Sequence, residues 1–302
     1  MTAANGGGGF LLIFLISTIL IGFPLLLAEF ALGRSAGVSA IKTFGKLGKN
    51  NKYNFIGWIG AFALFILLSF YSVIGGWILV YLGIEFGKLF QLGGTGDYAQ
   101  LFTSIISNPA IALGAQAAFI LLNIFIVSRG VQKGIERASK VMMPLLFIVL
   151  PQLFDKMPFG TIFYVLFLFA TVTSSVVMLE INVGNITNQD NSKRAKWSVI
   201  LGILTFVFGI PSALSYGVMA DVHIFGKTFF DAMDFLVSNL LMPFGALYLS
   251  LFTGYIFKKA LAMEELHLDE RAWKQGLFQV WLFLLRFVIP IIIIVVFIAQ
   301  FM

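Results

Sequence analysis

Seven stretches of this sequence are each long and apolar enough to cross a lipid bilayer as an α-helix. They lie near residues 9–32, 55–84, 109–127, 161–181, 197–214, 233–257 and 277–301. A helix needs about 20 apolar residues for such a crossing. An eighth apolar stretch, 141–154, is shorter and runs into Asp155 and Lys156. The sequence therefore predicts an all-α, polytopic transmembrane helical bundle, organised as a single transmembrane domain over residues 1–302.

The composition excludes several classes of protein. Hydrophobic residues make up 59% of the chain and charged residues only 11%, whereas soluble domains carry about 25% charged residues. Cysteine is absent, which excludes disulfides, thiolate metal sites and cysteine nucleophiles. Neither a paired-histidine motif, nor a Gly-x-Ser-x-Gly element, nor a Walker-type loop is present. We therefore expect that the protein is not an enzyme and that ATP does not drive it directly.

The charges between the spans predict the topology. In chain order, the connecting segments carry 5, 1, 4, 1, 3, 1 and 4 basic residues. This alternation is the positive-inside pattern of a multi-pass membrane protein, here of a plasma (bacterial inner) membrane. The net charge of +6 is thus a topology signal, and we do not expect a nucleic-acid partner. The pattern also puts Met1 outside, which suggests a missing earlier span.

The most informative polar run interrupts the span 161–181. Ala170 to Ser175 reads Ala-Thr-Val-Thr-Ser-Ser and places four hydroxyl groups in an otherwise apolar helix. Such hydroxyls bond the carbonyl of the preceding turn, or a neighbouring helix. Alternatively they contribute to a site for a hard cation such as sodium, which prefers oxygen ligands. The spacing alone leaves both interpretations open.

Other polar residues in or near the spans allow both a structural and a functional interpretation. Glu29 is either a buried functional carboxylate or an interfacial partner of Arg34. Tyr71 is either a packing residue or a ligand contact. Asp231 and Asp234, three residues apart on one helix face, either complement the helix dipole or form an outer gate for cations.

Arg286 lies nine residues into the last expected span, four residues before Pro290. A charged side chain at such a position faces other helices or extends to the membrane surface.

Several motifs in one order resemble the neurotransmitter:sodium symporter family. The chain carries Asn5-Gly6-Gly7-Gly8-Gly9-Phe10, Gly22-Phe23-Pro24, Glu29 to Arg34, Phe70-Tyr71 to Trp77, Gly134 to Arg137, Thr171 to Ser175, Gly226 to Phe235 and Leu285 to Pro290. The resemblance covers nearly the whole chain and is closest to the eleven-helix bacterial branch. It implies a leucine-transporter-like inverted-repeat fold with substrate and ions near the membrane midplane.

The resemblance also implies roles for individual residues. Ala170, Thr173 and Ser174 match the part of the second sodium site that the family's eighth helix supplies. Tyr71 matches the tyrosine that contacts an amino-acid carboxylate, and Leu67 and Met178 match apolar walls of the substrate pocket. Asp234 matches the outer-gate aspartate. The implied cofactor is the sodium ion and the implied substrate is a neutral or hydrophobic amino acid.

The sequence departs from the family in two places. It begins just past the family's first helix, and Leu150 is joined directly to Pro151, so that helices six and seven are expected to be missing and the fold incomplete. Two functions follow. The first is sodium-coupled symport of neutral or hydrophobic amino acids, which the loss would abolish in this form. The second is a non-transporting remnant or scaffold fragment of such a transporter.

Overall fold

The computed structural model describes residues 7–89, 98–130, 159–268 and 272–301. Seven helices in these residues are long and apolar enough to cross a membrane: Gly8–Ala36, Asn51–Gly87, Pro109–Ser128, Thr161–Thr187, Asn191–Leu214, Phe229–Ile256 and Trp273–Ala299. Each overlaps one of the seven long apolar stretches. The expected short segment 141–154 and the Leu150–Pro151 junction lie outside the described residues. The fold class is the predicted one, a polytopic helical membrane protein.

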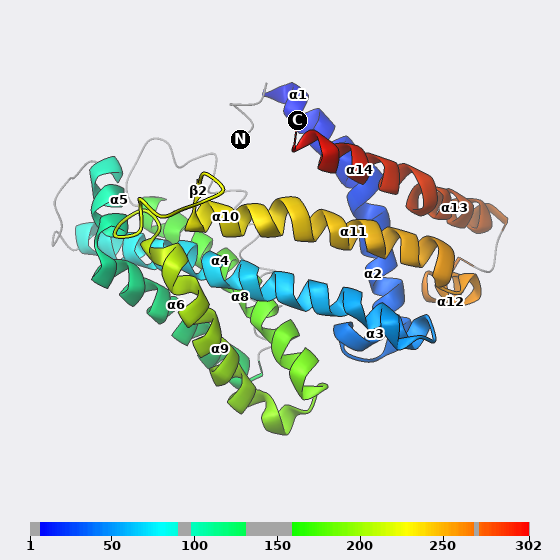
Figure 1. The fold of residues 1–302 in the computed structure, drawn as a ribbon, viewed down its shortest axis with the longest axis horizontal. Coiled ribbons are helices and arrows are strands. Elements are labelled where there is room, and N and C mark those ends of the chain that lie inside the picture. Colours follow the sequence, from blue (N-terminus) through cyan, green and yellow to red (C-terminus); the bar gives the residue numbers. More distant parts are fainter. Residues whose placement is uncertain (1–6, 90–97, 131–158, 269–271, 302) are drawn as a thin grey trace. The chain divides into compact units, whose positions relative to one another are not determined.

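The chain divides into two compact units (Figure 1). Unit 1 comprises residues 1–61 and 238–302, and unit 2 comprises residues 62–237. Two helical runs pass from one unit into the other without interruption: α4 (Asn54–Leu89), and the run of α10 (Phe229–Phe235), the π-helical turn η5 (Leu236–Leu241) and α11 (Met242–Leu251). That residues 1–302 form a single transmembrane domain stays a prediction.

Unit 2 is built around three packed helices, α6 (Pro109–Ser128), α8 (Phe159–Thr187) and α9 (Asn191–Leu214), with α5 (Tyr98–Ser107) beside α6 and α9. Their buried side chains form one cluster together with Leu68 of α4: Phe119, Val127, Val172, Val176, Leu179, Val183 and Leu201. Small residues allow the helices to approach closely. A Cβ on Gly76 would lie 2.8 Å from backbone atoms of Ala115 and Gln116, a contact typical of membrane helices.

Buried hydrogen bonds join the helices of unit 2. Ser175 Oγ of α8 donates to Asn123 Oδ1 of α6 at 2.7 Å, and Asn123 Nδ2 donates to the carbonyl of Phe119 at 2.8 Å. Gln116 Nε2 of α6 donates to Ser72 Oγ of α4 at 3.2 Å. Because hydrocarbon offers these groups no solvent, each bond replaces one that water would otherwise supply.

Unit 1 contains α1 (Gly8–Ser17), α2 (Phe23–Ala36), α3 (Ala40–Leu47), the 3₁₀ turn η3 (Asn51–Tyr53), α12 (Lys259–Glu265), α13 (Ala272–Phe283) and α14 (Ile289–Ala299). Phe252 is completely buried in its core. The rings of Phe44 and Tyr53 meet it edge-on, with centroids 5.0 and 5.5 Å away. Trp281 Nε1 donates to the carbonyl of Pro24 at 3.0 Å and so ties α13 to α2.

Three π-helical turns come directly before a helix that carries proline at its second position. These are η2 (Thr18–Gly22), η5 and η7 (Leu284–Val288), which precede Pro24, Pro243 and Pro290. Proline cannot donate to the carbonyl four residues earlier, and a π turn changes the hydrogen-bond register locally. The expected irregularity at Gly22-Phe23-Pro24 is therefore a π turn that ends where the proline-containing helix begins.

Two strands complete the described secondary structure. β1 (His223–Ile224) and β2 (Lys227–Thr228) form a short antiparallel hairpin that pairs His223 with Thr228 and Ile224 with Lys227. The hairpin turns at Phe225 and Gly226, which both have positive φ. It leads directly into α10 and so determines where that helix begins.

Asn123→Ala is expected to destabilise unit 2. The change removes the acceptor of Ser175 and leaves that hydroxyl with only the carbonyl of Val172 as a partner. Interhelical hydrogen bonds in membranes are worth about 0.6 to 1.7 kcal/mol, and we expect a loss at the upper end. The measurement is the unfolding midpoint in detergent. Ser128→Ala, at an exposed hydroxyl bonded within its own helix, is the control and should leave the midpoint unchanged.

Candidate functional site

Helix α8 turns two polar faces in different directions. Thr171 and Ser175 are buried, and Ser175 bonds Asn123 of α6. Thr173 and Ser174 lie on another face, where Thr173 is half-buried and Ser174 is exposed. The residues of the polar run thus divide between a helix–helix contact and an accessible surface, a division that follows from the period of 3.6 residues per turn.

Three oxygen atoms converge on the accessible face of α8. The carbonyl of Ala170 accepts from Thr173 Oγ1 at 2.9 Å and from Ser174 Oγ at 3.1 Å. Each hydroxyl points its hydrogen at the carbonyl, so its own lone pairs remain available to another donor or to a cation. The three residues expected at the sodium site are therefore brought together, on a single helix and without a charged group.

Helix α4 presents Leu67 and Tyr71 one turn apart on a half-buried face, whereas Ser69 and Ser72 are buried. Met178 of α8 is also half-buried and packs against the cluster that contains Leu68. The three residues expected to line a substrate pocket thus belong to two helices of unit 2 that share one hydrophobic cluster.

Asp231 belongs to a hydrogen-bonded group at the start of α10, which we call the outer polar cluster (Tyr216, Thr228 and Asp231). Thr228 is the N-cap residue, and its Oγ1 accepts from the backbone N–H of Asp231 at 3.2 Å and donates to Asp231 Oδ2 at 2.7 Å. Tyr216 donates its hydroxyl to Asp231 Oδ1 at 2.9 Å. Thr228 caps the helix, and both oxygens of Asp231 accept hydroxyl hydrogen bonds that fix the first turn of α10 to Thr228 and to the chain after α9.

Asp234 lies one turn after Asp231, and its side chain is exposed. The outer polar cluster fixes the first turn of α10 and thereby the position of Asp234. That Asp234 acts as an outer gate stays a prediction.

Sequence reasoning missed an aromatic cluster beside the outer polar cluster. Phe230 stacks on Trp77 with centroids 5.9 Å apart, and meets Phe70 edge-on at 5.4 Å. Phe102 meets Trp77 edge-on at 5.3 Å. The only available signal was an aromatic residue near the end of several spans, which is also typical of ordinary interface residues.

One expectation about ion pairs needs correction. Arg34 does not pair with Glu29; its Nε lies 3.2 Å from Glu265 Oε2, because α12 packs against α2. Glu180, for which the sequence indicated no partner, forms an ion pair with Arg194 of α9. Arg194 Nε also donates to the carbonyl of Val127 at 3.0 Å, so this one side chain joins the ends of α6, α8 and α9.

Comparison with known proteins identifies the family. Residues 1–91 match the model of the sodium:neurotransmitter symporter family. A Bacillus subtilis protein, named as the uncharacterized sodium-dependent transporter YhdH, is 37% identical, in an alignment that covers 98% of this chain and 90% of that protein. The chain belongs to the sodium:neurotransmitter symporter family.

Further relatives agree with this assignment. A Haemophilus influenzae protein named as an uncharacterized sodium-dependent transporter is 23% identical, in an alignment that covers 99% of this chain and 92% of that protein. The crystal structure of MhsT in complex with L-phenylalanine matches with a TM-score of 0.86 and 28% identity, covering 98% of this chain and 92% of that chain. The chain is thus a multi-pass membrane protein of a family of sodium-dependent transporters, which are not enzymes.

The alignment with the Bacillus protein extends over more positions than the residues of this chain can fill. It has 410 positions, and the chain has 302 residues. Subtracting 302 from 410 leaves at least 108 aligned positions without a residue of this chain. This number of unfilled positions agrees with the expected loss of helices, whose expected place, between Leu150 and Pro151, lies outside the described residues.

Asp231→Asn is expected to destabilise the start of α10. The amide nitrogen that replaces one carboxylate oxygen cannot accept from Thr228 or Tyr216, and the favourable charge at the helix N-terminus is lost. Loss of capping interactions costs about 0.5 to 2 kcal/mol. The measurement is the thermal unfolding midpoint in detergent. Asp221→Asn, at an exposed aspartate before the hairpin, is the control and should have little effect.

Tyr216 is expected to make the stability of the folded chain pH-dependent in the alkaline range. Burial, followed by the hydrogen bond to Asp231, raises the pKa of Tyr216 from 10.0 to about 12. Because the folded pKa is the higher one, the contribution is complete below pH 10 and is lost as the pH rises toward 12. The stability difference between the parent and Tyr216→Phe should therefore be constant up to pH 10 and decrease above it. A difference that stays constant through that range would contradict the raised pKa.

Proposed function

We propose that this chain carries sodium and substrate contacts of a sodium-coupled symporter for neutral or hydrophobic amino acids. The observation that carries the proposal is the convergence of Thr173 and Ser174 on the carbonyl of Ala170. Neutral hydroxyl and carbonyl oxygens are ligands that a hard monovalent cation accepts. A set without a fixed charge also suits release of the ion, because the ion is not held by a full countercharge.

The chemistry of the expected substrate residues agrees with a neutral amino acid. Tyr71 offers a hydroxyl that can donate to a carboxylate, and Leu67 and Met178 offer apolar surface to an uncharged side chain. MhsT was crystallised in complex with L-phenylalanine, which supports a hydrophobic amino acid as the substrate class here too. Sodium at α8 would stabilise the outward-open state, substrate would drive closure, and Asp234 would close the outer side.

Sodium is expected to raise the thermal unfolding midpoint of the purified chain relative to potassium at equal ionic strength. A ligand that binds only the folded state stabilises it, and about 1 kcal/mol corresponds to roughly 2–4 °C for a chain of this size. Thr173→Val should abolish the sodium effect because it removes one ligand. Thr171→Val is the matched control: it removes a hydroxyl of the same helix that bonds the carbonyl of Phe167 on the buried face.

Transport itself is tested in proteoliposomes with an inward sodium gradient. Uptake of radiolabelled phenylalanine or leucine that depends on sodium and is lost in Tyr71→Phe would support symport. A sodium-stabilised chain that takes up neither amino acid would contradict symport by this form while leaving the sodium site intact.

The second candidate is a non-transporting remnant or scaffold fragment. The observation that favours it is the alignment with the Bacillus protein, in which at least 108 of the 410 positions cannot be filled by the 302 residues of this chain. It predicts neither uptake nor a sodium-dependent midpoint, because ligands from other helices would be missing. If sodium raised the unfolding midpoint of the parent and of Thr173→Val by the same amount, the sodium site on α8 in particular would be contradicted.

A further inference from the structure

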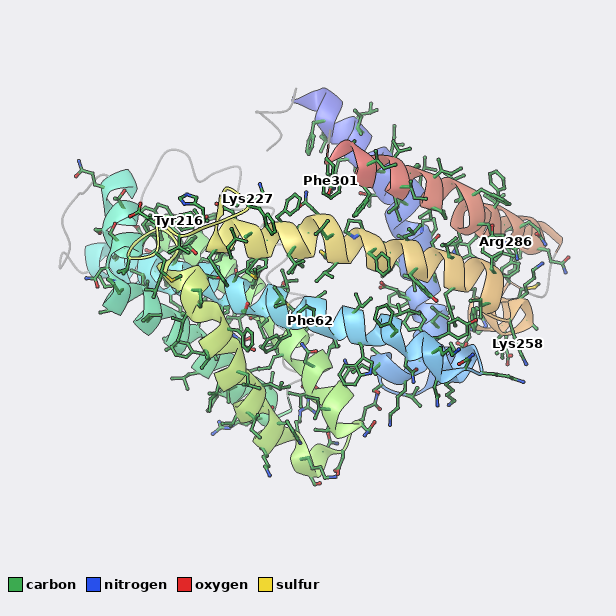
Figure 2. The ribbon with its side chains drawn as sticks, in the orientation of Figure 1. Phe62, Tyr216, Lys227, Lys258, Arg286 and Phe301 are labelled. Atoms are coloured by element: carbon green, nitrogen blue, oxygen red, sulfur yellow. The ribbon has the colours of Figure 1, made fainter. Side chains whose placement is uncertain are left out.

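The contact between α6 and α9 in unit 2 contains a row of buried polar side chains. Thr205, Gly209 and Ser212 follow one another at intervals of four and three residues, so they lie on one face of α9. All three are buried, and Gln116 of α6, which packs against Gly209, is completely buried. The row lies in the last turns of α9, shortly before Tyr216, which Figure 2 labels. We call Gln116, Thr205 and Ser212 the buried polar row.

Glycine at position 209 lets the amide group of Gln116 enter between the helices. A Cβ on Gly209 would clash with Nε2 of Gln116 and would lie 2.5 Å from the carbonyl oxygen of Ser69 in α4. A larger residue would therefore displace the amide group or the backbone of α4. The Gln116 amide is thus held between three helices of unit 2, which are α4, α6 and α9.

The hydrogen bonds of Ser72 determine which way this amide points. Ser72 Oγ donates to the carbonyl of Ser69 at 2.8 Å, which uses the single hydrogen of the hydroxyl group. The hydroxyl can therefore only accept from the amide, and Gln116 Nε2 donates to it at 3.2 Å. The amide nitrogen of Gln116 thus faces Ser72, and the amide oxygen, Oε1, faces away from it.

Three buried oxygen atoms of the polar row have no hydrogen-bond partner among the described residues. They are Gln116 Oε1, Thr205 Oγ1 and Ser212 Oγ. By contrast, Ser198 Oγ of the same helix α9 donates to the carbonyl of Arg194 at 2.8 Å. Burial of a polar group without a partner is unfavourable, because the group loses its hydrogen bonds to water and gains none. The three atoms therefore indicate a ligand that supplies hydrogen bonds.

The chemistry of these atoms selects the ligand. The amide oxygen of Gln116 can only accept hydrogen bonds, whereas each hydroxyl group can both donate and accept. A ligand that joins them must therefore donate to the amide and accept from a hydroxyl, as water does. Three uncharged oxygen atoms are too few for a hard cation, which takes about six oxygen ligands. An apolar ligand would leave all three atoms unpaired.

The helical spacing puts one hydroxyl within reach of the amide through a single water molecule. Along the axis of α9, Ser212 lies about 4.5 Å and Thr205 about 6 Å from Gly209, on which the Gln116 amide packs. A water molecule with two hydrogen bonds of about 2.8 Å joins atoms about 5.5 Å apart. Ser212 is therefore the partner that one water molecule joins to Gln116, and Thr205 lies on the other side of the amide.

We propose that Gln116 Oε1 and Ser212 Oγ bind a buried water molecule between α4, α6 and α9. The water donates to the amide oxygen of Gln116 and accepts from the hydroxyl group of Ser212. It thereby supplies partners that hydrocarbon cannot offer, as buried water does in other proteins. Because Ser72 directly follows Tyr71 in α4, the site also fixes the turn that carries Tyr71, whether or not Tyr71 contacts a substrate.

Radiolytic hydroxyl-radical labelling of the full chain in detergent detects such a water molecule. X-ray pulses form radicals from bound water as well as from bulk water, so a buried side chain is labelled only where water lies beside it. We expect labelling of the buried stretch of α6 around Gln116 and its loss in the double variant Gln116→Met/Ser212→Ala. Ser198→Ala is the matched control: it removes a buried hydroxyl of the same helix that has its own partner, and should keep the labelling.

The sign of the stability change in Ser212→Ala is an independent test. If the hydroxyl binds water, its removal loses a hydrogen bond and lowers the thermal unfolding midpoint by about 3 °C. If the hydroxyl is dry and without a partner, its removal relieves an unfavourable burial and raises the midpoint. In the Gln116→Met background, Ser212→Ala should have a smaller effect, because the shared water molecule is already lost.

Four results would overturn the proposal. They are an unlabelled stretch around Gln116 in the parent, labelling that persists in the double variant, a raised midpoint in Ser212→Ala, and an undiminished effect of Ser212→Ala in the Gln116→Met background. If Gln116→Met does not fold, Ser212→Ala alone decides: a lower midpoint together with reduced labelling supports the water site, and any other combination contradicts it.

Discussion

The absence of water in hydrocarbon is the constraint on which the rest of the structure depends. Every backbone polar group inside a membrane needs a partner within the protein, which restricts the spanning segments to helices. The same constraint governs the side chains of the spans. Thr171, Thr173, Ser174 and Thr253 all donate to carbonyls of the preceding turn of their own helix. A hydroxyl becomes available for another role only where an adjacent helix or an accessible surface offers a second partner.

That requirement separates two roles within one short run of sequence. Ser175 donates to Asn123 of a neighbouring helix and so contributes to packing, whereas Ser174, one residue earlier, faces an accessible surface together with Thr173. The helical period could predict that neighbouring positions face different directions, but not which face meets another helix. Resemblance to a family selected the three residues of the accessible face, and the spacing of the hydroxyls alone did not.

The spans were predictable because hydropathy over 20 residues is a property of the segment itself, and the fold class followed from it. Pairwise contacts were less predictable, because they depend on segments that are distant in sequence. Arg34 was expected to pair with Glu29 five residues away, but it pairs with Glu265 on another helix. The spacing of Asp231 and Asp234 on one helix face did not distinguish them, and the bonds of Asp231 to Thr228 and Tyr216 could not be predicted from it.

The division into two units falls inside two continuous helices that differ in stiffness. One boundary, between residues 61 and 62, lies in the uninterrupted α-helix α4, and the other, between residues 237 and 238, lies in the π turn η5 shortly before Pro243. Helices bend at π turns and prolines, whereas an unbroken α-helix resists bending. The two helical runs therefore differ in where they can bend: the run through α10, η5 and α11 can bend at η5, whereas α4 contains neither a π turn nor a proline.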